Sequence, residues 1–129
     1  LQALERLIRA LPFAPWRVCP GSLDMPGLYA LIESAPLHLS GDTGSMHLAR
    51  LAGTPSVTWM SALASHRSWA PEGDRHGVVY STVPPETYLL GVSTDAILEM
   101  STDRLRSPSG AGDRRERSGP ARQGRQSGT

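Results

Sequence analysis

The stretch from Leu37 to Met60 constrains the fold more than any other part of the chain. A short apolar run leads into a polar turn that holds Gly41 and Gly44, and a segment with helical spacing follows. After Gly53 and Pro55 comes a second run, rich in β-branched residues. Strand, turn, helix and strand in this order form the repeating unit of a parallel α/β fold. The sequence therefore predicts an α/β domain built on a parallel sheet.

The polar turn is a candidate anion site. Gly41 and Gly44 allow backbone angles that other residues resist, and glycine lets a ligand approach the backbone closely. Ser45 is expected to cap the helix that starts there. The first amides of a helix have no partner within it and, with the helix dipole, they favour a bound anion.

Side chains around the turn support the same interpretation. Thr43 and Ser45 add hydroxyl groups, and His47 falls in the first helical turn, where we expect it to face the mouth of the loop. Asp42 does not fit a phosphate site directly, because a carboxylate repels phosphate. We expect it to accept backbone amides that shape the loop, or to accept a sugar hydroxyl. A capped strand-to-helix turn without a ligand is the alternative.

One residue pattern favours the ligand-binding interpretation. The run Gly-Asp-Thr-Gly-Ser-Met-His-Leu-Ala resembles the signature of glycosyltransferase family 9, the ADP-heptose:lipopolysaccharide heptosyltransferases. That signature places Asp, Thr or Ser, and Gly ahead of His, Leu or Ile, and Ala, and continues to a Gly-x-Pro before the next strand. The matching positions are Asp42, Thr43, Gly44, His47, Leu48, Ala49, Gly53 and Pro55.

The resemblance implies a fold and a role for each loop residue. The fold would be a Rossmann-like three-layer α/β domain, the C-terminal half of a GT-B glycosyltransferase, over residues 1–105. Asp42, Thr43, Gly44 and His47 would contact an ADP-sugar, and the amides of Gly44, Ser45 and Met46 would hold its diphosphate. His47 would donate to a phosphate oxygen as the bond to the sugar breaks. This is electrostatic leaving-group stabilisation that needs neither a metal nor a further cofactor.

Two flanking segments are expected to complete the donor site. In the resembled family, the connection before the helix that follows residue 24 lies under the adenine, which would make Ser22 and Leu23 neighbours of the base; an ordinary turn is the alternative. Arg67 lies in the long loop 61–74 and could reach a diphosphate as a charged donor, or remain a solvated surface residue. The run from residue 61 to 63, Ser-Ala-Leu, departs from the Gly-Pro-Thr of the family.

The resemblance also implies what this sequence does not contain. The family's catalytic base is a carboxylate in an N-terminal domain, which also binds the lipid-sugar acceptor. This chain alone is therefore expected to transfer nothing, as a fragment or a truncated relic. With its partner half it would transfer heptose, or a related sugar, to a lipopolysaccharide-core acceptor. The alternatives are a non-catalytic nucleotide- or anion-binding module and a fold remnant without a ligand.

The remaining elements follow from hydrophobic periodicity and turn residues. We expect the first helix to pack on the sheet, the second to bury Leu28, Leu31 and Ile32, and the third to pack through Leu48, Leu51 and Ala52. The predicted helices are Leu1–Leu11, Asp24–Ser34 with Asp24 as its cap, Ser45–Ala52 with Gly53 as its stop, and a last one from Ser93 or Thr94 to Leu105. The predicted strands are Trp16–Cys19, Leu37–Ser40, Pro55–Met60 (central or edge) and Val78–Tyr80.

Composition and charge limit the function classes. The chain contains 129 residues and one cysteine, so no internal disulfide is possible and a reducing compartment fits. No apolar run approaches the ~20 residues of a membrane helix. The family resemblance implies a location in the bacterial cytoplasm, with peripheral contact at the inner membrane in the complete enzyme. His and Cys spacing predicts no metal site.

Charge is unevenly distributed along the chain. Six arginines and nine acidic residues lie in 1–100, whereas seven arginines and three acidic residues lie in 101–129. Residues 106–129 lack the apolar side chains that would offset ordering entropy, so we expect a disordered basic tail. No nucleic-acid partner is expected, although a basic tail could touch nucleic acid or anionic lipid.

Overall fold

The computed structural model describes residues 2–106, and the predicted tail lies outside this range except for Arg106. Three parallel strands, β1 (His38–Gly41), β2 (Ser56–Met60) and β3 (His76–Tyr80), form one sheet in the order β1-β2-β3. β2 lies in the centre, with Ser56 beside both His38 and His76. The predicted parallel sheet is confirmed, and the position of β2, which the sequence left open, is the central one.

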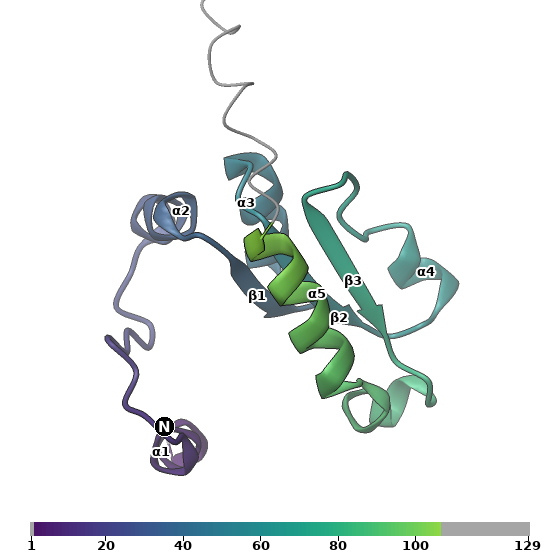
Figure 1. Cartoon of the computed structure of the whole chain (residues 1–129), viewed down its shortest axis with the longest axis horizontal. Coiled ribbons are helices and arrows are strands. Elements are labelled where there is room, and N and C mark those ends of the chain that lie inside the picture. The colour runs from purple at the N-terminus through teal and green to yellow at the C-terminus, as the bar shows by residue number, and fades with distance from the viewer. Residues whose placement is uncertain (1, 107–129) are drawn as a thin grey trace, which may run out of the picture.

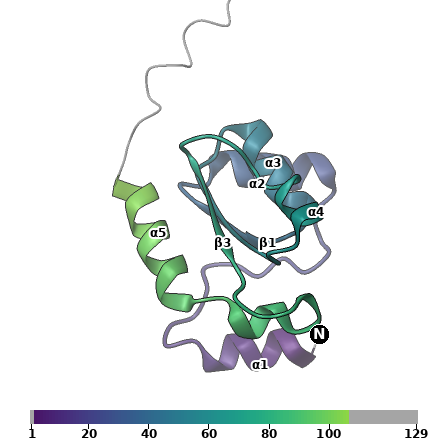
Figure 2. The same cartoon turned by 90° about the vertical axis from the view of Figure 1, so that its right-hand side faces the viewer.

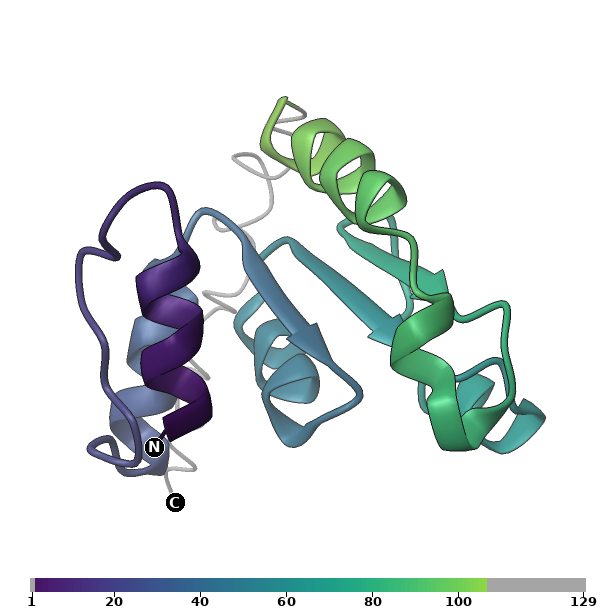
Figure 3. The same cartoon turned by 90° about the horizontal axis from the view of Figure 1, so that it is seen from below.

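Helices cover both faces of this sheet. α3 (Gly44–Ala52) lies on one face, with α2 (Met25–Ser34) beside it, and α5 (Thr94–Arg106) lies on the other (Figures 1 and 3). Figure 2 shows α5 on the side of the strands away from α3. Two short helices, α4 (Ala64–Arg67) and the 3₁₀ helix η1 (Pro85–Gly91), interrupt segments that the sequence predicted as loops. The Rossmann-like three-layer arrangement is confirmed.

Local signals account for the helix ends. The Asp24 carboxylate accepts the Gly27 amide at 2.9 Å and caps α2, as predicted. Gly53 ends α3 at φ +69°, a left-handed conformation that suits glycine. The Ser93 hydroxyl accepts the Ala96 amide at 3.2 Å at the start of α5. The Thr54 hydroxyl donates to the Ile32 carbonyl at 2.9 Å and joins α2 to the turn after α3.

The core is small and lies between α3 and the sheet and between the sheet and α5. Gly77 of β3 is where α5 packs closest, because Met100 occupies the space that a side chain there would need. Several serine and threonine side chains are buried beside the apolar ones. The buried apolar residues are Ile32, Met46, Ala49, Val57, Met60 and Val79.

Four packing predictions were wrong. The helix α1 (Gln2–Ala10) buries none of its residues and lies apart from the sheet (Figure 1). The predicted strand at Trp16–Cys19 is absent, and Trp16 is 89% exposed. A strand needs a neighbouring strand for its backbone hydrogen bonds, and no described strand pairs with this segment. Leu31 and Leu51 are exposed, whereas Ile32 of α2 and Met46 of α3 are buried.

The packing of α3 generates a stability prediction. Met46 is fully buried and Leu51 is 75% exposed, so Met46→Ala should lower the free energy of unfolding by about 2 to 5 kcal/mol because it leaves a cavity. Leu51→Ala, the matched control in the same helix, should change it by no more than about 0.5 kcal/mol. Urea denaturation followed by circular dichroism measures both. Equal losses would contradict the assigned orientation of α3.

Candidate functional site

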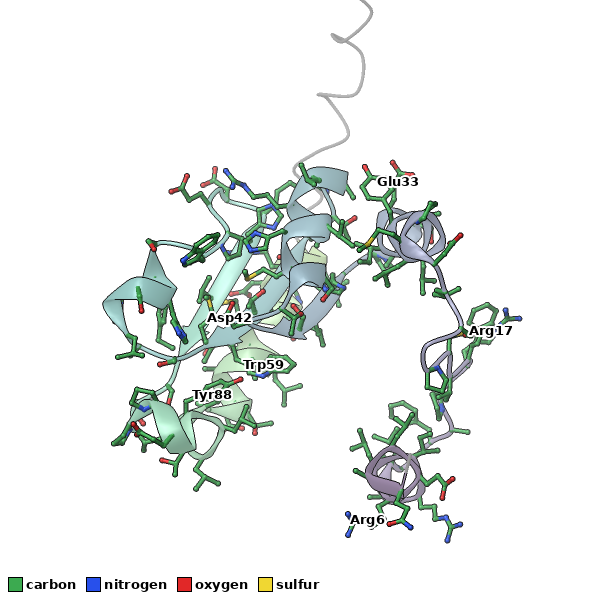
Figure 4. The ribbon with its side chains drawn as sticks, turned by 180° about the vertical axis from the view of Figure 1, so that it is seen from behind. Arg6, Arg17, Glu33, Asp42, Trp59 and Tyr88 are labelled. Atoms are coloured by element: carbon green, nitrogen blue, oxygen red, sulfur yellow. The ribbon has the colours of Figure 1, made fainter. Side chains whose placement is uncertain are left out.

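The carboxyl ends of the three strands meet at one edge of the sheet, where ligands of open α/β folds bind. Asp42 follows β1 directly, Ser61 follows β2 and Ser81 follows β3. α4 lies near this edge, because His66 contacts Asp42 after β1, and Arg67 contacts Ala62 after β2 and Tyr80 at the end of β3. Figure 4 shows Asp42 on the sheet domain together with Trp59 and Tyr88, whereas Arg6 lies on the separate helix α1.

The turn between β1 and α3 has an open backbone. Neither Gly41 nor Gly44 has the positive φ that a glycine can adopt. Gly41 is needed for space, since a side chain there would lie 3.2 Å from the Trp59 indole nitrogen. A side chain at Gly44 would meet nothing within 4 Å, so the start of α3 is free to be approached. This accessible backbone is what an anion site requires.

The helix begins one residue earlier than the sequence predicted. Thr43, in extended conformation, is the N-cap and makes no capping hydrogen bond, so the prediction of Ser45 as the cap was wrong. The Met46 amide donates to the Thr43 carbonyl at 3.1 Å, and the Met46 side chain is fully buried. Of the three amides predicted to hold a diphosphate, those of Gly44 and Ser45 therefore remain for a ligand.

The hydroxyls of the loop form a chain that reaches back to the sheet. Thr43 Oγ1 lies 3.0 Å from Ser45 Oγ, and Ser45 Oγ lies 3.2 Å from His38 Nε2. Burial lowers the pKa of His38 below its ordinary value of 6.5, which favours a neutral ring. His38 was not among the predicted site residues. The sequence signal that could have identified His38 was its position in the predicted strand, four residues before Asp42.

Asp42 faces α4 rather than the amides of its own loop. Its Oδ2 lies 3.4 Å from His66 Nδ1, and within residues 2–106 the backbone amides that donate to side chains donate to others. The expectation that Asp42 shapes the loop through backbone amides was therefore wrong, and the alternative, a contact with a sugar hydroxyl, stays a prediction. Sequence spacing could not predict the contact between Asp42 and His66 of the β2–β3 connection, because these residues lie 24 positions apart.

The Arg67 side chain makes two contacts within the protein. Its Nε donates to the Ala62 carbonyl at 3.3 Å, and its guanidinium lies 4.4 Å from the centre of the Tyr80 ring, a cation–π contact. Arg67 thus joins the ends of β2 and β3. The predicted diphosphate contact of Arg67 stays a prediction.

His47, Ser22 and Leu23 take no part in the two sets of contacts at the loop, which join Ser45 to His38 and Asp42 to His66. His47 is half-buried and lines a surface hollow with residues 50–53 on the flank of α3. Ser22 and Leu23 are exposed in the segment before α2. Among the described contacts, none joins these three residues to the loop, and their predicted roles stay predictions.

A second histidine with a lowered pKa, His76, lies at the start of β3, where the amino ends of the strands meet. His76 Nδ1 lies 2.9 Å from the Ser56 hydroxyl. Burial is the main cause of the lowered pKa, and the charges of Arg50, Arg75 and Arg104 add to it. This edge lies away from the strand ends where the loop opens, so we assign it a structural role.

In residues 2–106, no three His, Cys, Asp or Glu side chains lie close enough together to hold a metal ion. Across the same range, every helix is too short or too polar to cross a membrane.

The sequence profile of glycosyltransferase family 9 (heptosyltransferase) matches residues 1–88. This chain belongs to glycosyltransferase family 9. The match includes the Asp42–His47 loop and all three strands, and it ends before α5. No curated protein and no solved structure matches the chain. The family 9 chain is thus a glycosyltransferase-like α/β domain whose loop lies at the edge where the carboxyl ends of the strands meet.

Burial of His38 predicts a loss of stability in acid. Because folding lowers its pKa below 6.5, the unfolded chain binds the proton more readily, and stability rises with pH across this window. The free energy of unfolding should therefore fall as the pH falls through 6.5 and should level off below the folded pKa.

Urea denaturation at about pH 7.5 and about pH 5.5 measures this loss. His38→Gln should make the difference between the two pH values smaller, whatever it does to stability at either one. His76→Gln should act in the same direction, independently. An unchanged acid loss in His38→Gln would contradict the burial argument.

Proposed function

We propose that this family 9 chain is the donor-binding part of a glycosyltransferase and takes a nucleoside-diphosphate sugar, with ADP-heptose as the first candidate. The observation that carries the proposal is the open start of α3. The Gly44 and Ser45 amides lie at the start of α3, near the carboxyl ends of the strands, and no side chain blocks Gly44. The diphosphate would lie against these amides, beside the hydroxyls of Thr43 and Ser45.

The proposed reaction is an inverting transfer to a lipopolysaccharide-core or other glycan acceptor. The acceptor hydroxyl attacks the anomeric carbon, the bond from that carbon to the phosphate oxygen breaks, and the nucleoside diphosphate leaves. The helix amides stabilise the negative charge that develops on the leaving group. His47 would donate to the same group, and Asp42 would accept a sugar hydroxyl. No metal or further cofactor takes part in this proposal.

The acceptor and the base that takes its proton would come from a separate domain. This chain is therefore proposed to bind donor but to transfer nothing alone. The proposed site of action is the cytoplasm, with peripheral contact at the inner membrane in the complete enzyme.

A non-catalytic nucleotide-binding module is the second candidate. One observation favours it: His47 lines the flank of α3 together with residues 50–53 rather than the mouth of the loop. Binding and transfer would then be separable, because the amides alone suffice for a diphosphate, whereas leaving-group stabilisation by His47 requires its ring at the loop.

Gly44→Val tests the donor site directly. A Cβ at this position meets nothing within 4 Å apart from the adjoining chain, so the variant should fold, but the two methyl groups of valine should stand where the diphosphate approaches. Calorimetric titration with ADP should give a dissociation constant at least about tenfold larger than that of wild type. Leu51→Ala, on the exposed flank of the same helix, is the control and should bind as wild type does.

Parallel titrations with UDP and GDP test the base. Preference for ADP would support an ADP-sugar, whereas equal affinities would indicate a generic diphosphate site. Unchanged ADP affinity in Gly44→Val would contradict the placement of the diphosphate.

A further inference from the structure

A carboxylate stands at the mouth of the proposed diphosphate site. Asp42 lies two residues before Gly44, whose amide is proposed to bind the phosphate oxygens. Two like charges this close repel each other, and the repulsion is stronger where water is partly excluded. The proposed function therefore requires something that holds or compensates the Asp42 carboxylate.

His66 is the group that faces this carboxylate. Its Nδ1 lies 3.4 Å from Asp42 Oδ2, and the two side chains are 41% and 30% exposed. Nδ1 itself is shielded from solvent and takes part in no hydrogen bond among the described residues. A polar atom buried in this way loses its hydration without replacement, so the nearby carboxylate is the partner that relieves the loss.

The backbone of α4 fixes where His66 lies. The His66 amide donates to the Leu63 carbonyl at 3.0 Å, and the His66 carbonyl accepts the Trp69 amide at 3.1 Å. The next residue, Arg67, binds the Ala62 carbonyl and stacks on Tyr80. His66 is therefore carried by a turn that is held to the ends of β2 and β3, and its ring reaches the end of β1.

We propose that His66 is a positioning residue of the donor loop. Through Nδ1 it holds the Asp42 carboxylate on the α4 side and offsets its charge, so that the diphosphate can reach the Gly44 and Ser45 amides. At 3.4 Å a ring that carries both protons forms an ion pair with Asp42, and a neutral ring with its proton on Nδ1 turns the positive end of its N–H dipole toward the carboxylate. The ligand class is a nucleoside diphosphate, so the inference rests on the proposed function.

A double-mutant cycle on the full 129-residue chain tests this role. ADP affinity is measured by calorimetry for wild type, His66→Ala, Asp42→Asn and the double variant. His66→Ala should weaken ADP binding about fivefold, the size expected for a partly exposed charged pair. In the Asp42→Asn background the same substitution should cost nothing, because the charge to be held is gone. A purely structural role of His66 would cost the same in both backgrounds.

Two controls keep the result interpretable. Ser65→Ala changes the neighbouring exposed position of α4 and should bind ADP as wild type does. If circular dichroism shows that His66→Ala does not fold, His66→Gln takes its place in the same cycle. A wild type that binds ADP, with no loss in either His66 variant or with equal losses in both backgrounds, would overturn the inference and leave the donor site standing. A folded wild type that does not bind ADP would overturn the proposed function and this inference with it.

Discussion

The parallel pairing of β2 with both β1 and β3 is the constraint on which the rest of the structure depends. Because the three strands run the same way, their carboxyl ends meet at one edge, and each following segment begins there. The start of α3, the turn that becomes α4 and the segment after β3 are neighbours for this reason alone. Burial of Val57 and Met60 on opposite faces of β2 fixes its register and holds that edge in place.

The edge combines an attractive field with a repulsive charge. Helix amides and hydroxyls around Ser45 favour an anion, whereas the Asp42 carboxylate opposes one. The structure places a histidine on each side of this arrangement: His38 contacts the Ser45 hydroxyl from the sheet, and His66 contacts Asp42 from α4. The loop is thus supported from β1 and from α4, and its chemistry belongs to the assembled edge rather than to the motif alone.

The sequence predicted those features that local chemistry determines. The Asp24 cap, the Gly53 stop and the order of strand and helix around the loop follow from nearby residues, and all were confirmed. Packing of α1 and pairing of Trp16–Cys19 depend on distant partners, and both predictions were wrong. The Asp42–His66 contact was missed for the same reason. In α3, Leu51 and Met46 are both apolar, so only the sheet decides which of them is buried.

Backbone amide NMR during an ADP titration of the 129-residue chain reports where the nucleotide binds. We expect the largest shifts at the Gly44 and Ser45 amides, with smaller ones around Asp42 and His66. Shifts concentrated at the other edge of the sheet, around Arg75 and His76, would contradict it, as would a spectrum of the folded chain that ADP leaves unchanged.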